Sequence, residues 1–195
     1  MAGKLIPTPS QTVGPFFHIG LARPEWSDLT AQNPQGERIA IEGRVLDGDG
    51  AAVPDALIEL WQANAAGRYN HVDDRQADKA VDPNFRGYGR AATDFEGKYR
   101  FVTIKPGSVP GRGNALQAPH INLAVFARGT LKQLYTRLYF AEDPQNGNDP
   151  LLSAIDDQAA RRTLIAARDP RGGSLPIYRF DIVLQGENET VFLDL

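Results

Sequence analysis

Short strand-like segments separated by turn residues run along most of the chain. In RIAIEGRVLD, Ile39, Ile41 and Val45 fall on one face of an extended strand. Comparable runs bounded by Gly, Pro, Asn or Asp follow in ALIELWQA, GKYRFVTIKPG, HINLAVFARG, LYTRLYF, IYRFDIVLQG and ETVFLDL. So many short strands with turns between them predict an all-β sandwich or barrel.

The N-terminal region departs from this pattern. Five prolines exclude a long helix there: Pro7, Pro9, Pro15, Pro24 and Pro34. Phe16 and Phe17 would be costly to leave in water, since burying one such ring is worth about 2 kcal/mol. We therefore expect residues 1–36 to form an irregular arm that packs on the core or on a partner, and residues 37–195 to form one β-sandwich domain.

Two further regions interrupt the strands. Pro150 can begin a helix, and four apolar residues with polar residues between them indicate one or two short amphipathic helices near 150–168: Leu152, Ile155, Leu164 and Ile165. The connection from Asn64 to Gly89 is long for a β domain, and long loops are usually functional or disordered.

Composition narrows the function. With 21 Lys+Arg against 24 Asp+Glu the net charge is -3, which favours neither nucleic acid nor an anionic membrane as a partner. No cysteine is present, so His, Tyr, Asp and Glu remain as the strong metal ligands. No apolar run approaches the roughly 18 residues of a membrane span, and the N-terminus lacks an apolar signal segment. We expect a cytoplasmic protein.

Tyr69 in GRYNHVDDR and His120 in APHINL could carry metal chemistry. A phenolate oxygen suits a hard ferric ion, although a loop tyrosine and a lone strand histidine are more often structural. Residues two apart on a strand share a face, so a His-x-His here would offer two imidazoles to one metal. This chain has Asn122 at the second position.

Three other features of the sequence bear on possible chemistry. Residues 107–119 are glycine-rich, but they lack GxxxxGK[ST] and lead into no helix, which argues against phosphate binding. Arg128 in FARG follows an apolar strand, where its charge must reach solvent or meet an anion. GxSxG is absent, so no serine nucleophile is indicated.

Five segments together resemble the intradiol ring-cleaving dioxygenases over nearly the whole chain: PSQTVGPFFHIG, GRVLDGDGAAVPDALIELWQANAAGRY, DPNFRGYGRAATDFEGKYRFVTIKPG, APHI and YRFDIVLQGENETVFLDL. WQANAAGRY, TIKPG and PHIN form the most specific part. The resemblance implies a β-sandwich of the intradiol dioxygenase type. It also implies a non-haem ferric ion bound through two tyrosines and two histidines.

The resemblance implies that this chain has lost half of that metal site. Tyr69 and His120 match a tyrosine and a histidine of the family, whereas Val109 and Asn122 stand where the second tyrosine and the second histidine are expected. Gln117 replaces the arginine that precedes the histidine pair. These positions are therefore expected to be vestigial, with no metal in this chain.

Among these dioxygenases, the chain resembles the iron-free alpha subunit of members built from two homologous sandwiches. The resemblance implies a beta subunit that holds Fe(III), alpha-beta heterodimers in a larger oligomer, and cleavage of protocatechuate (3,4-dihydroxybenzoate) by O2 to 3-carboxy-cis,cis-muconate. Residues of this chain are expected to complete the beta subunit's substrate pocket: Thr12, Gly14, Pro15 and Arg128.

Two alternatives stay open at this point. The chain could be a non-catalytic, transthyretin-like β-sandwich binding module. It could also be a stand-alone oxygenase that recruits Tyr88 or Tyr135 as a substitute ligand.

Overall fold

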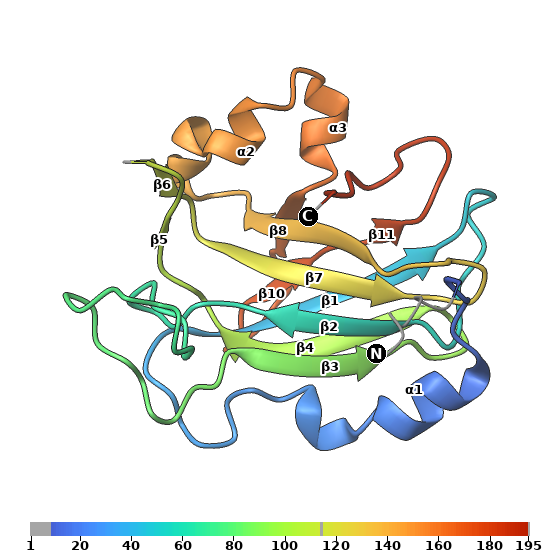
Figure 1. The fold of residues 1–195 in the computed structure, drawn as a ribbon, viewed down its shortest axis with the longest axis horizontal. Coiled ribbons are helices and arrows are strands. Elements are labelled where there is room, and N and C mark those ends of the chain that lie inside the picture. The colour runs from blue at the N-terminus through green and yellow to red at the C-terminus, as the bar shows by residue number, and fades with distance from the viewer. Residues whose placement is uncertain (1–8, 114, 195) are drawn as a thin grey trace, which may run out of the picture.

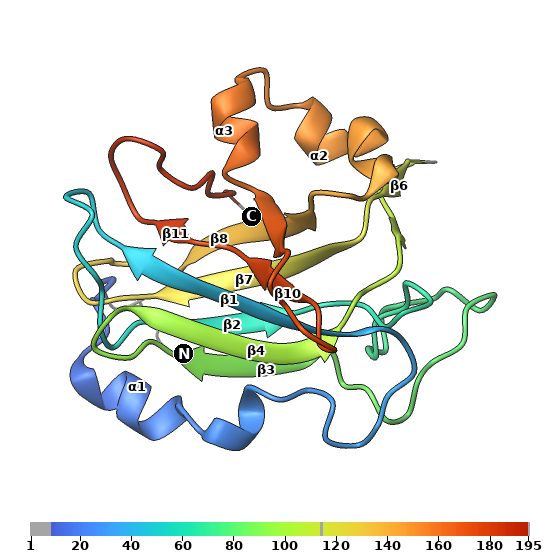
Figure 2. The same cartoon turned by 180° about the vertical axis from the view of Figure 1, so that it is seen from behind.

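The computed structural model describes residues 9–113 and 115–194 and consists mostly of strands in two packed layers (Figures 1 and 2). One layer contains, in order, β3 (Tyr88–Ala92), β2 (Leu57–Trp61), β7 (His120–Phe126) and β8 (Leu134–Phe140). The other contains β4 (Lys98–Ile104), β1 (Arg38–Leu46), β10 (Ile177–Arg179) and β9 (Ile165–Asp169), with β11 (Ile182–Val183) beside the end of β1. The predicted all-β sandwich is confirmed.

Strand β9 joins the two layers. It pairs antiparallel with β10 and, over two residue pairs, parallel with β8. Residues 93–97 connect β3 of one layer to β4 of the other through a tight turn. The layers thereby form a nearly closed structure, with a small separate hairpin of β5 (Val109–Pro110) and β6 (Leu116–Gln117) at one end (Figure 1).

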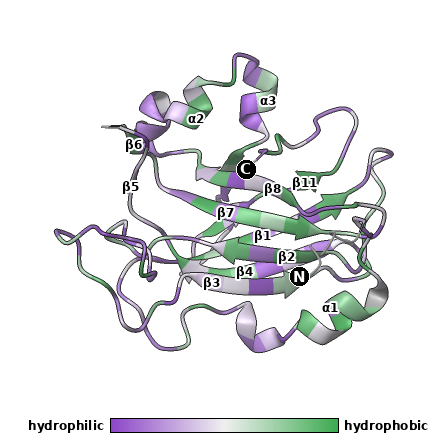
Figure 3. Cartoon of the chain, in the orientation of Figure 1, coloured by the Kyte–Doolittle hydropathy of each residue, from purple (hydrophilic) through white to green (hydrophobic). Residues whose placement is uncertain are grey.

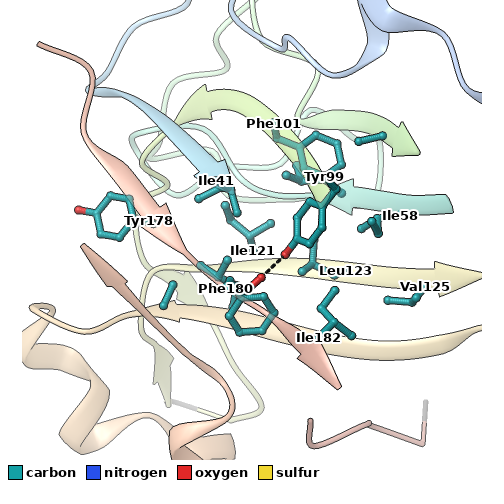
Figure 4. Close-up of a cluster of buried hydrophobic side chains, with 14 of the residues drawn as sticks. Ile41, Ile58, Tyr99, Phe101, Ile121, Leu123, Val125, Tyr178, Phe180 and Ile182 are labelled. Atoms are coloured by element: carbon teal, nitrogen blue, oxygen red, sulfur yellow. Dashed lines mark hydrogen bonds between the residues drawn. The ribbon is translucent and has the colours of Figure 1, made fainter. Parts of the chain in front are cut away.

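The core lies between the layers and follows from the alternation of side chains along the strands. In β7, Ile121, Leu123 and Val125 are at most 1% exposed, and they belong to one cluster with Ile58 of the neighbouring strand β2 and Ile41 of β1 in the other layer (Figure 4). The predicted inward residues of β1, Ile39, Ile41 and Val45, are fully buried as expected.

A buried tyrosine ties the strands of the second layer together. Tyr99 on β4 donates a hydrogen bond of 2.6 Å from its hydroxyl to the backbone carbonyl of Phe180 (Figure 4). Gly43 on β1 lies under the same carbonyl, since a Cβ there would stand 1.7 Å from that oxygen. The close approach of the Phe180 backbone to β1 therefore requires glycine at position 43.

The N-terminal segment contains a short helix and packs partly on the sandwich. Helix α1 (Pro15–Leu21) is followed by the 3₁₀ helix η1 (Pro24–Trp26). The ring of Phe17 lies 5.1 Å from that of Phe126, whereas Phe16 is 83% exposed. Only one of the two phenylalanines is therefore covered by this chain. Pro7, in the expected arm, lies outside the described residues.

Short helices occur near the predicted place, between β8 and β9: η2 (Pro144–Asn148), α2 (Pro150–Ser153) and α3 (Gln158–Arg162). Asp149 caps α2, because its carboxylate accepts the backbone N–H groups of Leu151 and Leu152. The prediction was wrong for Ile165, which begins β9 because the chain there pairs with β8 and β10.

Two strand predictions also need correction. ETVFLDL forms no regular strand in the described residues, and its Leu193 makes only an isolated bridge to Tyr135. Strand β3 was missed, because its sequence YGRAA has neither β-branched nor alternating residues. No helix in residues 9–113 and 115–194 is both long enough and apolar enough to cross a membrane.

Replacing Tyr99 by Phe is expected to lower the free energy of unfolding by about 1–3 kcal/mol, because it removes a buried donor and leaves the Phe180 carbonyl without that partner. Urea denaturation measures the change. Tyr135→Phe is the matched control: its hydroxyl lies on a half-buried residue and accepts from Gln133. A loss at Tyr99 no larger than at Tyr135 would contradict the structural role of this bond.

Candidate functional site

The four positions expected to be vestigial metal ligands lie at one end of the sandwich, where β7 begins. Tyr69 comes from the long loop after β2, Val109 from β5, and His120 and Asn122 from the start of β7 (Figure 1). Asn122 donates to the hydroxyl of Tyr69 at 3.2 Å. Tyr69 and Val109 both line a cavity of about 450 Å³. Tyr69, Val109 and Asn122 are thus brought together, whereas the contacts of His120 are to Ala118 and Tyr139.

Trp61 shapes this cavity and was not singled out from the sequence. It is paired with Asn122 in the β2–β7 register, and its ring stacks on Tyr69 at 5.6 Å between centroids. Asn122 also donates to the backbone carbonyl of Trp61 at 3.2 Å. The stacking and the two hydrogen bonds of Asn122 position the Tyr69 hydroxyl next to the strand.

His120 is a buried, neutral imidazole. It is 3% exposed, and its Nδ1 lies 2.8 Å from the carbonyl oxygen of Ala118. Because a carbonyl can only accept, Nδ1 carries the proton and Nε2 keeps its lone pair. Burial, reinforced by the nearby charge of Arg137, lowers the pKa of His120 to about 4.

Tyr69 is a protonated phenol in this environment. Burial raises the pKa of its hydroxyl, and the hydrogen bond from Asn122 and the charge of Arg137 oppose that effect only in part. Ferric iron favours an anionic phenolate, and of the surrounding groups Asn122 and Arg137 favour that form of Tyr69 whereas burial opposes it.

Arg137 is the main residue of the site that sequence reasoning missed. It lies directly opposite Asn122 in the pairing of β7 with β8. Its Nε donates to Asn122 Oδ1 at 3.0 Å, and its Nη1 donates to Gln117 Oε1 at 2.6 Å. A guanidinium therefore stands beside the expected ligand positions. Its signal in the sequence was an arginine inside the apolar run LYTRLYF.

A buried carboxylate, that of Asp149 at the start of α2, holds the segment that precedes β7. Asp149, which is fully buried, accepts the backbone N–H of Ala118 at 2.9 Å and the hydroxyl of Tyr139 at 3.1 Å. Ala118 in turn accepts from His120. The cap of α2 thus holds the segment that leads into β7.

The four positions do not fit a ferric ion. Val109 offers no lone pair, and the oxygen of Asn122 already accepts from the guanidinium of Arg137. Within residues 9–113 and 115–194, no group of three or more His, Cys, Asp or Glu could hold a metal ion. The imidazole of His120 remains as a good ligand.

The residues expected to bind substrate for a partner lie at the other end of β7. Arg128 follows this strand by two residues, roughly 25 Å from His120 at the rise of an extended strand. Thr12 lies beside it, because its hydroxyl accepts the backbone N–H of Gly129 at 2.7 Å. Gly14 is the N-cap of α1, and Pro15 is the first residue of this helix. The two segments therefore come together, although Thr12 and Gly129 are 117 residues apart in the sequence.

Asp55 holds Arg128 at this end. The Nε of Arg128 lies 2.7 Å from Asp55 Oδ2, and the arginine side chain is 60% exposed. Asp55 has a positive φ of 66°, which non-glycine residues adopt rarely. The ion pair orients the guanidinium and leaves much of it open to solvent.

Neither of the two substitute tyrosines points to the metal positions. The hydroxyl of Tyr88 donates to Glu59 at 2.8 Å, and burial together with this acceptor raises its pKa to about 12. Tyr135 accepts from Gln133 and lies beyond Arg137 on β8. These contacts count against the stand-alone oxygenase.

The chain belongs to the intradiol ring-cleaving dioxygenases, since a family described as Dioxygenase matches residues 14–186. It is 43% identical to the protocatechuate 3,4-dioxygenase alpha chain of Pseudomonas putida over 98% of each chain. It is also 44% identical to the protocatechuate 3,4-dioxygenase beta chain of Burkholderia cepacia, over 93% of this chain and 77% of that one. These relatives favour the dioxygenase family over a transthyretin-like module.

Solved structures share the fold. The dioxygenase domain of a fusion with a carbohydrate-binding protein from Streptomyces sp. SirexAA-E matches with a TM-score of 0.62 and 26% identity, over 93% of this chain and 99% of that one. Catechol 1,2-dioxygenase from Pseudomonas arvilla C-1 matches with a TM-score of 0.62 over 82% of this chain and 55% of that one, at 22% identity. The second likeness concerns the fold alone.

His120 makes stability depend on pH. Its pKa is about 4 in the fold and near 6.5 when unperturbed, so the unfolded chain binds more protons between these values. The free energy of unfolding therefore carries no penalty from His120 above about pH 6.5, and it decreases as the pH falls from 6.5 toward 4. We expect the midpoint of urea denaturation to fall between pH 7 and pH 5. The midpoint of the His120→Gln variant should fall less over the same range. Equal drops in the two proteins would contradict this assignment.

Proposed function

We propose that this chain is the alpha-type, iron-free subunit of a hetero-oligomeric ferric intradiol dioxygenase. The complex would cleave protocatechuate with O2 to 3-carboxy-cis,cis-muconate, and both oxygen atoms would enter the product. The observation that carries the proposal is the contrast between the two ends of β7. One end has metal positions that do not fit iron, whereas the other presents an open arginine beside the N-terminal segment.

The proposal assigns Fe(III), on which the family depends, to a homologous beta subunit. Its support is the mismatch at Val109 and Asn122 together with the existence of relatives named as alpha and beta chains. Overall identity does not separate the two kinds of chain, because it is 43% to an alpha chain and 44% to a beta chain. The residues at the ligand positions are therefore the support for the alpha-type assignment. Alpha-beta heterodimers would then assemble into a larger oligomer.

Arg128 is proposed to bind the carboxylate of protocatechuate in the beta subunit's site. Arginine suits this task because its planar guanidinium can bind a carboxylate through two N–H groups. In this chain its Nε faces Asp55, so the terminal nitrogens are available on a side chain that is 60% exposed. The ion pair limits the loss of side-chain freedom when a substrate binds.

The N-terminal segment is proposed to line the same pocket. The hydroxyl of Thr12 accepts a hydrogen bond from Gly129, in the loop that carries Arg128. Gly14 and Pro15 follow at the start of α1. Among the described residues, apart from its neighbours in the chain, no heavy atom lies within 4 Å of the position that a Cβ of Gly14 would occupy. A flat aromatic ring could therefore approach the backbone closely at this glycine.

The distribution of iron tests the subunit assignment. Purified alone, this chain is expected to contain far less than one ferric ion per molecule. Expressed together with a beta-type partner, it should copurify with that partner in a complex that carries the visible absorption of tyrosinate bound to iron. Elemental analysis and absorption spectroscopy measure both. One tightly bound iron in the isolated chain would refute the proposal.

Arg128→Ala tests substrate recognition in the complex. A hydrogen bond to a charged group contributes about 1.5–3 kcal/mol, so kcat/KM for protocatechuate should fall by roughly tenfold to a hundredfold. Unsubstituted catechol, which has no carboxylate, serves as the matched substrate and should lose much less. Equal losses for both substrates would mean that Arg128 supports the fold or the interface.

A further inference from the structure

We propose that Asp55 is a positioning residue that makes the complex selective for a catechol bearing a carboxylate, because it holds the guanidinium of Arg128 in the direction that this carboxylate needs. The inference rests on the role proposed above for Arg128. It adds the group on which the selectivity of that arginine depends. Asp55 itself would touch neither the substrate nor the iron.

The pairing of two strands brings Asp55 to Arg128. Strands β2 and β7 pair antiparallel, and Leu57 lies opposite Phe126 at one end of the ladder. Continued by two residues along each chain, the same register places Asp55 opposite Arg128. Opposite charges that face each other across paired strands attract, and Arg128 Nε lies 2.7 Å from Asp55 Oδ2. The architecture of the sheet therefore sets this contact.

A buried threonine fixes the backbone around Asp55. The hydroxyl of Thr93, a residue that is 5% exposed, donates to the carbonyl of Val53 at 2.8 Å and accepts the N–H of Ala56 at 2.9 Å. These two bonds hold the chain on both sides of Asp55, whose φ of 66° lies in the left-handed region. The direction in which the Asp55 side chain leaves the backbone is thereby fixed.

Local structure alone does not call for an aspartate at position 55. Glycine adopts a positive φ without steric cost, and it would bury no charge. The Asp55 side chain is only 17% exposed, and among the described residues its Oδ1 is buried without a hydrogen-bond partner. Such an oxygen is costly. The contact that the carboxylate adds in return is the ion pair with Arg128, which points to a role in function.

The pair fixes the plane of the guanidinium. With Nε of Arg128 facing Asp55, the terminal N–H groups on the opposite edge can bind both oxygens of a carboxylate. An exposed arginine without such a partner would lose side-chain freedom on binding, which lowers affinity. The negative charge of Asp55 acts in the opposite sense, because it repels an approaching carboxylate. The sign of the effect of removing Asp55 therefore decides which influence is larger.

Two substitutions in the complex with the beta-type partner separate these influences. Asp55→Gly removes the carboxylate and suits the positive φ, whereas Asp55→Asn keeps an oxygen that can accept from Nε. Glu96→Gln, at an exposed carboxylate in the turn between β3 and β4, is the matched control for net charge. Steady-state kinetics with protocatechuate and with catechol are measured for each complex, and urea denaturation checks that each variant is folded.

Asp55→Gly is expected to raise KM for protocatechuate by about threefold to tenfold, the effect of one poorly ordered side chain, with kcat little changed because this binding is remote from the reacting carbons. The dissociation constant of protocatechuate measured without O2 should rise equally. Catechol should change much less. Asp55→Asn should lie between Asp55→Gly and the unaltered complex, and Glu96→Gln should match the latter.

A double variant shows whether Asp55 acts through Arg128. In a complex that already carries Arg128→Ala, Asp55→Gly should have no further effect on KM for protocatechuate, because the residue that it positions is gone. An added effect of the same size as in the single variant would mean that Asp55 acts independently of Arg128, which would overturn the proposal.

The results also separate this proposal from the one on which it rests. An unchanged or lower KM for protocatechuate in folded Asp55→Gly, while Arg128→Ala keeps its carboxylate-specific loss, would overturn the role of Asp55 alone. Equal losses for both substrates in Arg128→Ala would overturn both roles. Equal losses for both substrates in Asp55→Gly would make Asp55 a structural residue. If the Gly variant does not fold, the same comparisons are made with Asp55→Asn, which weakens the bond to Nε by removing its charge.

Discussion

The alternation of side chains along β7 is the constraint on which both the core and the site depend. Ile121, Leu123 and Val125 point into the sandwich and are almost fully buried. His120 and Asn122 therefore share the opposite face, toward the loop of Tyr69. A shift of one residue in the pairing would turn these polar groups into the core. The apolar face thus fixes where chemistry can occur on this strand.

The surroundings of Asn122 show how polar side chains in a half-buried pocket satisfy one another's hydrogen bonds. An asparagine has one donor group and one acceptor group, and Asn122 uses them toward Tyr69 and Arg137 in turn. A histidine would have left the guanidinium without this acceptor, because an imidazole whose free nitrogen binds metal has no lone pair to offer. The identity of residue 122 and that of residue 137 therefore belong together. Buried polar groups that lack such partners are costly.

Sequence reasoning found the strands that carry an apolar face and the residues placed by local motifs, such as Tyr69 and His120. It could not find Arg137, because the contact depends on the register between β7 and β8. Seven residues, 127–133, connect these strands, and a loop of this length does not fix one register. Ile165 was misassigned for a related reason: its apolar neighbours suit a helix as well as a strand, and only pairing with β8 and β10 decides.

β7 has chemically different tasks at its two ends, and this separation bears on how the chain can evolve. Near His120 the strand contacts buried groups of this chain, whereas near Arg128 it meets the surface that we assign to a partner's substrate. Substitutions at the first end would be tolerated so long as the buried polar groups there still satisfy one another's hydrogen bonds. Substitutions at the second end, near Arg128, would be selected against because they would impair an activity located in another polypeptide. A single strand could thus preserve one end and vary at the other, with the buried alternation between them unchanged.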